Sequence, residues 1–144
     1  MTRVLLILAL FFFAPLSFAN DSPAGLWKTI DDKTNKPRSL VRIVEENGEY
    51  KGIVEKGLVE GESPERVCDK CDPPRKGQKI LGMTFMWGLK KDGNEFKGGE
   101  ILDPDNGKIY RCKMKLIDGG KKLDVRGFIG IALIGRTQTW LREE

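Results

Sequence analysis

The segment KIYRCKMKLI, residues 108–117, alternates apolar and basic side chains with a period of two. Successive side chains of a β-strand point to opposite faces of a sheet, so this alternation gives one apolar face and one charged face. The segment therefore predicts a strand of an antiparallel sheet, with one face buried and the other in water. The apolar face would carry Tyr110, Cys112, Met114 and Leu116, and the charged face Arg111, Lys113 and Lys115.

Turn sequences flank this strand and separate further extended segments on both sides of it. DPDNG precedes the strand, DGGK follows it, and Asn47-Gly48 is a strong hairpin signal nearer the start of the chain. No window has the period of a helix, and β-branched and aromatic residues recur between the turns. The expected strands cover residues 25–31, 38–46, 49–56, 79–91, 95–102, 108–117, 122–130 and 133–142, with a long polar connection over 57–79.

Eight consecutive strands, joined mostly by short turns, predict an all-β, antiparallel up-and-down barrel. Eight strands suffice to close a sheet into a small barrel whose interior is filled or holds one small ligand. A Greek-key sandwich is the alternative architecture. It requires long returns between strands, which the tight turns do not provide, so the barrel is favoured.

The two ends of the expected barrel resemble the lipocalins. Gly25-Leu26-Trp27 is similar to the Gly-x-Trp signature of that superfamily, in which the tryptophan closes one end of the barrel and an arginine of the last strand lies across it. The resemblance implies that Trp27 plugs the barrel and that Arg136 or Arg142, both in phase with Trp140, covers it. A guanidinium stacked on an indole contributes about 0.5–2 kcal/mol.

Four longer segments resemble one particular family of exported bacterial proteins, known only as a domain of unknown function with a lipocalin-like barrel. The resemblance covers the whole chain after its N-terminal segment and implies the fold and export, but no chemistry. The segments are GLWKTIDDKTNKPRSLVRI, CDKC, GGEILDPDNGKIYRCKMKL and LDVRGFIGIALIGRTQTW.

The N-terminus has the pattern of a secretory signal peptide. Arg3 precedes an apolar run over residues 4–16, and Ser17-Phe18-Ala19 offers small residues at a cleavage site. We expect residues 1–19 to be removed and residues 20–144 to form one exported domain, periplasmic or secreted, with no stable membrane insertion after cleavage.

Composition narrows the range of functions. The formal net charge of +4 is spread along the chain without a basic block, so no nucleic-acid partner is expected. The chain has no histidine, which excludes Ser–His and Cys–His dyads and histidine-based metal sites. We expect no cofactor and no metal.

The three cysteines raise the question of a bridge, a redox site or a metal site. Cys68 and Cys71 are separated by two residues in ERVCDKCDPPRKGQ, residues 65–78, and Cys112 lies on the expected inward face. A thioredoxin-like site would place such a pair at a helix N-terminus, and zinc would need about four ligands. In an oxidising compartment a local Cys68–Cys71 disulfide is favoured, which would staple a loop beside the barrel mouth. A bridge from either residue to Cys112, and metal-bound or free thiols, are the alternatives.

The function favoured by the sequence is the binding of a small, mainly apolar ligand inside the barrel, without catalysis. A filled barrel acting as an envelope interaction or structural protein is the alternative. An enzyme would need a carboxylate pair such as Glu100 and Asp103, but DPDNG has the composition of an ordinary turn. The expected ligand-binding residues are Met83, Phe85, Trp87, Glu100, Tyr110, Met114 and Leu123, with Glu100 facing inward if Phe96 and Gly98 do so.

Overall fold

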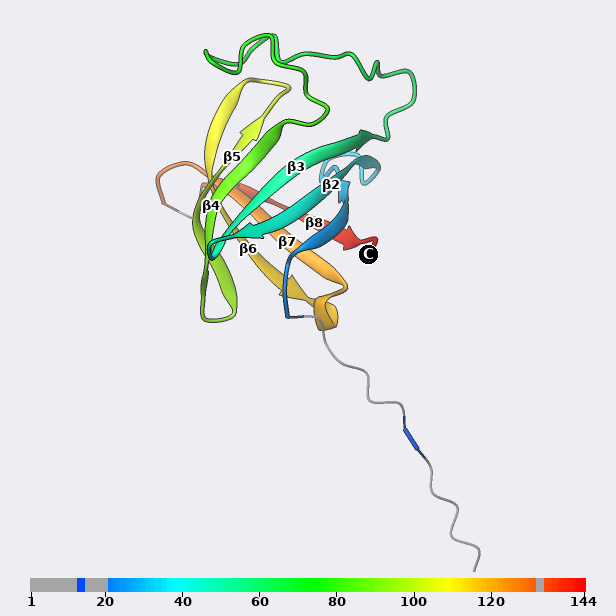
Figure 1. Cartoon of the computed structure of the whole chain (residues 1–144), viewed down its shortest axis with the longest axis vertical. Coiled ribbons are helices and arrows are strands. Elements are labelled where there is room, and N and C mark those ends of the chain that lie inside the picture. Colours follow the sequence, from blue (N-terminus) through cyan, green and yellow to red (C-terminus); the bar gives the residue numbers. More distant parts are fainter. Residues whose placement is uncertain (1–12, 15–20, 132–133) are drawn as a thin grey trace, which may run out of the picture.

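The computed structural model describes residues 13–14, 21–131 and 134–144, and the expected signal peptide lies almost wholly outside them. Residues 25–142 form eight antiparallel strands that close into a barrel (Figure 1). One short 3-10 turn, η1 (Asp118–Gly120), joins β6 to β7. The strands are β1 (Gly25–Ile30), β2 (Pro37–Glu46), β3 (Glu49–Gly57), β4 (Thr84–Asp92), β5 (Glu95–Asp103), β6 (Lys108–Ile117), β7 (Lys122–Phe128) and β8 (Gly135–Arg142).

Each strand pairs with its neighbours in the sequence, and the first pairs with the last. Trp27 of β1 lies opposite Arg142 of β8, and the pairing continues beyond β8 because the Leu26 N–H donates to the Glu144 carbonyl at 3.0 Å. The up-and-down barrel predicted from the turns is therefore confirmed, and the sandwich is not formed. No helix among the described residues is long and apolar enough to cross a membrane.

Three strand boundaries differ by two or more residues from the sequence-based expectation. β4 begins at Thr84 rather than at residue 79, β7 ends at Phe128, and β8 begins at Gly135. Residues 79–83 instead belong to the long connection, where Gly82 has φ +87° and its N–H donates to the Val54 carbonyl at 2.8 Å. A positive φ interrupts a strand, so the apolar residues before it do not extend β4.

Bulges in β4 and β5 change which side chains face inward. Gly88 has φ +77° and Gly98 has φ +79°, and the β5–β6 register shifts between Phe96 and Gly99. Each bulge adds one residue, so the inward face of β5 passes from Phe96 to Gly99 and Ile101, and Glu100 is exposed on the outer face. The expected inward position of Glu100 is wrong for this reason.

The core follows the inner faces of the strands around the barrel. It includes both buried tryptophans and the two disulfide-bonded cysteines. Among the described residues, no buried side-chain nitrogen or oxygen lacks a hydrogen-bond partner. The most fully buried large side chains are Trp27, Trp140, Ile43, Met83, Met86, Leu89, Met114 and Leu123.

Candidate functional site

One end of the barrel is closed by Trp27 and Arg142. The Trp27 indole is fully buried, and its Nε1–H donates to the Pro23 carbonyl at 2.8 Å. The Arg142 guanidinium lies 4.3 Å from the centre of the Trp27 ring. It also donates to the carbonyl oxygens of Ser22, Ala24 and Gly120, at 2.6–3.0 Å. One guanidinium thus ties the segment before β1 and the β6–β7 turn to the last strand.

Gly25 permits this closure because of its position against the arginine. It has φ +139°, and a Cβ atom there would lie 2.9 Å from Arg142 Nη1 and 2.5 Å from the Glu144 carbonyl oxygen. The glycine of the Gly-x-Trp sequence is therefore required by close approach as well as by backbone conformation. Arg136, the other candidate for covering Trp27, lies at the opposite end of β8, where its Nε contacts the Asp32 carboxylate at 3.2 Å.

That opposite end opens into a cavity of about 780 Å³, which is lined by the inner barrel wall and by the loops around the mouth. Its deep part is formed by apolar residues, among them Phe85 and Trp140, whose ring centres lie 6.1 Å apart. Drug-sized ligands occupy pockets of about 300–1,000 Å³, so the volume suits one small molecule. The apolar lining residues include Val41, Val54, Ile80, Leu81, Phe85, Ile101, Val125, Phe128 and Trp140.

Two of the seven expected ligand-binding residues line this cavity, namely Phe85 and Tyr110. Tyr110 accepts a hydrogen bond from Asn106 Nδ2 at 2.9 Å, so its hydroxyl belongs to the polar part of the wall. Met83, Met114 and Leu123 are at most 2% exposed and belong to the packed core, outside the cavity lining. Whether any of these residues binds a ligand stays a prediction.

Trp87 and Glu100 lie on the outer face of the barrel, outside the cavity lining. The two residues are in register, and Glu100 is exposed. The Trp87 ring is covered from outside by the Arg75 guanidinium of the long β3–β4 connection, 4.4 Å from the ring centre. The period-two pattern of β4 failed here because the β3–β4 register shifts between Gly52 and Ile53. Phe85 and Met86 are therefore buried in succession, and Trp87 turns outward.

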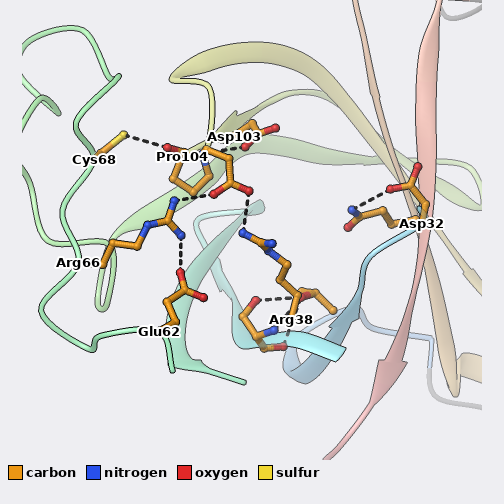
Figure 2. A network of polar contacts seen from close by, with 11 residues as sticks. Asp32, Arg38, Glu62, Arg66, Cys68, Asp103 and Pro104 are labelled. Carbon is orange, nitrogen blue, oxygen red and sulfur yellow. Dashed lines mark hydrogen bonds and ion pairs between the residues drawn. The ribbon is translucent and has the colours of Figure 1, made fainter. Parts of the chain in front are cut away.

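Charged side chains from three elements meet at the cavity mouth (Figure 2). Asp105, in the β5–β6 turn, accepts hydrogen bonds from Arg38 of β2 at 2.6 Å and from Arg66 of the β3–β4 connection at 2.5 Å. Arg66 also pairs with Glu62, four residues before it. The carboxylates of Asp105 and Glu62 raise the pKa of Arg66 above its usual value. The network joins the long connection to the barrel rim.

A second contact crosses the mouth on its other side. Asp32, in the β1–β2 turn, pairs with Arg136 and accepts a hydrogen bond from Gln138 Nε2 at 3.3 Å. The charged residues that line the cavity are balanced in sign, so the mouth favours neither a simple anion nor a simple cation. The basic ones are Lys33, Arg38, Lys56, Arg66 and Arg136, and the acidic ones are Asp31, Glu55, Glu62, Asp103 and Asp105.

The β3–β4 connection, drawn in green in Figure 1, runs across the mouth end of the barrel. Cys68 and Cys71 form the predicted disulfide, and both are buried. Lys70 and Cys71 approach the backbone of Gly107 so closely that no side chain at residue 107 would fit. Glu62, Ser63, Pro64 and Arg66 line the cavity, as expected for a loop stapled beside the mouth.

Cys112 has no sulfur partner, so the long bridge considered from the sequence is not formed. Its side chain lies on the inner face between two glycines, Gly99 and Gly127, which face it in the neighbouring strands. Burial raises the pKa of the Cys112 thiol to about 12, which leaves it a poor nucleophile. The described residues contain no group of three or more cysteine or acidic side chains placed to hold a metal ion.

The two carboxylates considered for catalysis lie in different environments. Glu100 is on the outer face of β5, while Asp103 is at the cavity mouth and accepts the Asp105 backbone N–H at 2.9 Å. Asp103 therefore has the ordinary role of the first residue of a turn, as DPDNG predicted. Sequence reasoning missed the rim pairs Arg38–Asp105 and Asp32–Arg136, because their partners are far apart along the chain.

A closed eight-stranded barrel with a plugged end and an open, apolar cup defines a lipocalin-like protein. The chain belongs to the family described as "Uncharacterized protein conserved in bacteria (DUF2147)", whose model matches residues 25–142.

Among solved structures, the chain is similar to protein HP1028 of Helicobacter pylori, which is described as belonging to the lipocalin family. The TM-score is 0.73 with 22% sequence identity, over 84% of this chain and 82% of that one. No curated protein matches the chain. The resemblance to HP1028 extends to the fold.

Proposed function

We propose that the protein is an exported binder of one small, mainly apolar molecule, which it holds in the barrel cavity without catalysis. The observation that carries the proposal is the 780 Å³ cavity, with apolar side chains at its depth and charged and polar groups at its mouth. Ligand pockets in proteins have this composition, mostly apolar with a few polar groups that orient the ligand. A filled structural barrel would not keep this space.

The arrangement of polar groups indicates which part of the ligand goes where. Phe85 and Trp140 face the deep cavity, whereas Tyr110, Asn106 and Gln138 lie among its polar lining residues. An apolar body would lie against the aromatic pair, and a neutral or zwitterionic polar group would face the balanced charges of the mouth. The balance of charge argues against a ligand recognised by a single formal charge.

Export is part of the proposal. It is supported by the N-terminal sequence, with Arg3 before an apolar run and small residues at 17–19. A disulfide between Cys68 and Cys71 is characteristic of oxidising compartments such as the periplasm. N-terminal sequencing of the protein from the exported fraction should give Asn20 as the first residue.

Titration with N-phenyl-naphthylamine, an apolar dye that fluoresces when bound in an apolar site, tests the cavity. Gly127 lines the cavity, and a phenyl ring placed there would enter it. We expect one saturable site in the native protein and an affinity about tenfold weaker in Gly127→Phe, equivalent to about 1.4 kcal/mol. Leu141→Phe adds the same ring on the outer face at the closed end and should leave the titration unchanged. Equal affinities in the two variants would refute binding inside the barrel.

A further inference from the structure

The β7–β8 turn presents an unusually apolar tip to water. Ile129, Ile131 and Ile134 are 60%, 63% and 64% exposed, the highest values for large apolar side chains in the described barrel residues. The turn is held by its backbone, because the Ile129 N–H donates to the Ile134 carbonyl at 2.9 Å. A cluster of exposed apolar side chains on a monomer usually marks a surface that binds another molecule, because binding removes those side chains from water. These three residues are referred to below as the isoleucine tip.

The isoleucine tip borders the cavity mouth. Ile129 and Ile134 are both lining residues of the cavity, while Ile131, between them in the sequence, is not. In Figure 1 the β7–β8 connection, drawn in orange, projects beyond the barrel wall. Through Ile129 and Ile134, the tip is continuous with the lining of the apolar cup.

Basic side chains cover the outer wall next to the tip. Lys113 of β6 and Arg126 of β7 lie directly opposite each other, and Arg111 lies opposite Phe128, the last residue of β7. Like charges in register destabilise a sheet, so this pairing has a cost in stability. Glu100, opposite Arg111 on β5, and Asp124, two residues before Arg126 on the same face of β7, are carboxylates beside this group. Arg126 also donates to Thr137 Oγ1 at 3.0 Å. The alternation in the sequence placed Arg111 and Lys113 on one charged face, and the pairing of β6 with β7 adds Arg126 to it.

We propose that the isoleucine tip docks reversibly on an anionic phospholipid bilayer. The three isoleucines would enter the boundary between head groups and acyl chains, and Arg111, Lys113 and Arg126 would face lipid phosphates. Apolar insertion combined with nearby basic side chains is the chemistry of peripheral binding to anionic membranes. The docked protein would present its cavity mouth to the membrane surface.

Charge and shape favour a bilayer over a second copy of the chain. A symmetric dimer through the tip would bring the basic walls of two copies toward each other and add like-charge repulsion. Three aliphatic side chains alone also bury less area than a stable protein interface requires. Docking does not depend on the proposed ligand, although it would give an apolar ligand a route into the cavity that avoids water.

Co-sedimentation with lipid vesicles tests the proposal. One set of vesicles is pure phosphatidylcholine, and the other is an equimolar mixture with phosphatidylglycerol. We expect the protein to bind the mixed vesicles at least about tenfold more strongly, with affinity falling as salt rises. Exchanging all three isoleucines of the tip for serine should lower binding to mixed vesicles by at least about tenfold. The native protein and all variants are used in the same processed form, beginning at Asn20, so the apolar residues of the expected signal peptide do not contribute to binding.

Matched variants separate the tip from general effects of surface changes. Leu141→Ser, an exposed apolar residue at the closed end, should leave vesicle binding unchanged. Arg111→Gln with Lys113→Gln should weaken binding to mixed vesicles, whereas Lys90→Gln with Lys91→Gln, at the far end of β4, should not. If the triple serine variant unfolds, Ile131→Ser alone tests the tip, because Ile131 does not line the cavity.

Three results would overturn the proposal. The first is no binding of the native protein to either set of vesicles, and the second is equal binding by the native protein and the folded tip variants. The third is that the native protein does not bind vesicles but forms a dimer in size-exclusion chromatography, and that the tip variants are monomers. Titrating Ile131→Ser with the dye separates this test from that of the proposed function. The dye reports on the cavity alone, so its binding should be unchanged in Ile131→Ser even where vesicle binding is lost.

Discussion

Arg142 shows how much a single side chain contributes to closing the barrel. It stacks on Trp27 and donates to three backbone carbonyls that lie in two other segments. Each buried carbonyl that loses its donor costs about 1–3 kcal/mol, unless water replaces the donor. The contribution of Arg142 therefore comes from satisfying the polar backbone at the barrel end, in addition to its contact with the indole.

We predict that Arg142→Ala lowers the free energy of unfolding by about 2–4 kcal/mol, because it removes these hydrogen bonds and the cation–π contact. Arg136→Ala, in the same strand, is the matched control. Its salt bridge to Asp32 is about half-exposed at the arginine and should contribute less than about 1 kcal/mol. Urea unfolding followed by tryptophan fluorescence measures both. Similar losses in the two variants would show that the closed end does not depend on this guanidinium.

For single residues, the sequence limited the arginine that covers Trp27 to two candidates but could not distinguish between them. Both Arg136 and Arg142 have the phase of Trp140, and phase fixes a face, whereas the distance along the barrel depends on how β8 pairs with β1. The pairing places Arg142, six residues further along the chain, opposite Trp27. The inward orientation expected for Glu100 was wrong for a different reason. The bulge that turns Glu100 outward uses Gly98, and a glycine within a strand does not by itself identify a bulge.

Among the elements, the β1–β2 turn illustrates stabilisation by one carboxylate. Asp31 Oδ1 accepts the backbone N–H groups of Lys33 at 2.8 Å and Thr34 at 2.9 Å. These hydrogen bonds, that of Thr34 first, lower the pKa of Asp31 below its ordinary value of 3.8. They favour the ionised carboxyl, so the turn is most stable when Asp31 is charged.

The sign of the pH dependence follows from this lowered pKa. The turn should keep its full stability above about pH 4 and lose it as the pH falls through the lowered pKa of Asp31, because protonation weakens both acceptor interactions. NMR titration of the Thr34 amide should show a midpoint below 3.8. Asp31→Asn, which cannot ionise, should remove this transition. A midpoint at or above 3.8 would show that the turn does not stabilise the carboxylate.

The sequence predicted one feature of the long β3–β4 connection, its disulfide, but not how the connection packs on the barrel. The short spacing and the expected compartment predicted the Cys68–Cys71 disulfide, which the structure confirms. The docking of that loop depends on Gly107 in the β5–β6 turn and on the Arg66–Asp105 pair. Both connect residues more than thirty positions apart, which no local pattern records. The same limit applies to Arg75 over Trp87.

For the whole molecule, the sequence predicted the architecture well because turns and alternation are local signals. Eight strands with tight connections leave few ways to pair except in order, and pairing in order brings the first strand to the last. The size of the cavity is not a local property. It depends on the sum of side-chain volumes around the barrel, so sequence reasoning left an open cup and a filled barrel as alternatives.

Two glycines that flank Cys112 test where the interior is open. Gly99 and Gly127 lie on either side of Cys112 at one level of the barrel. A Cβ at Gly127 would meet its nearest neighbour at 3.5 Å, beside the cavity. A Cβ at Gly99 would lie 2.5 Å from Leu89 Cγ and 2.6 Å from the Trp87 carbonyl oxygen.

We predict that Gly127→Ala leaves the free energy of unfolding unchanged or raises it by about 0.5–1 kcal/mol, because alanine loses less backbone entropy on folding. Gly99→Ala should lower it by about 1–3 kcal/mol, because the new methyl group overpacks the wall between β4 and β5. Urea unfolding of both variants measures the difference. Equal destabilisation would mean that the barrel is packed on both sides of Cys112, and the cup proposed to hold a ligand would then be too small at this level.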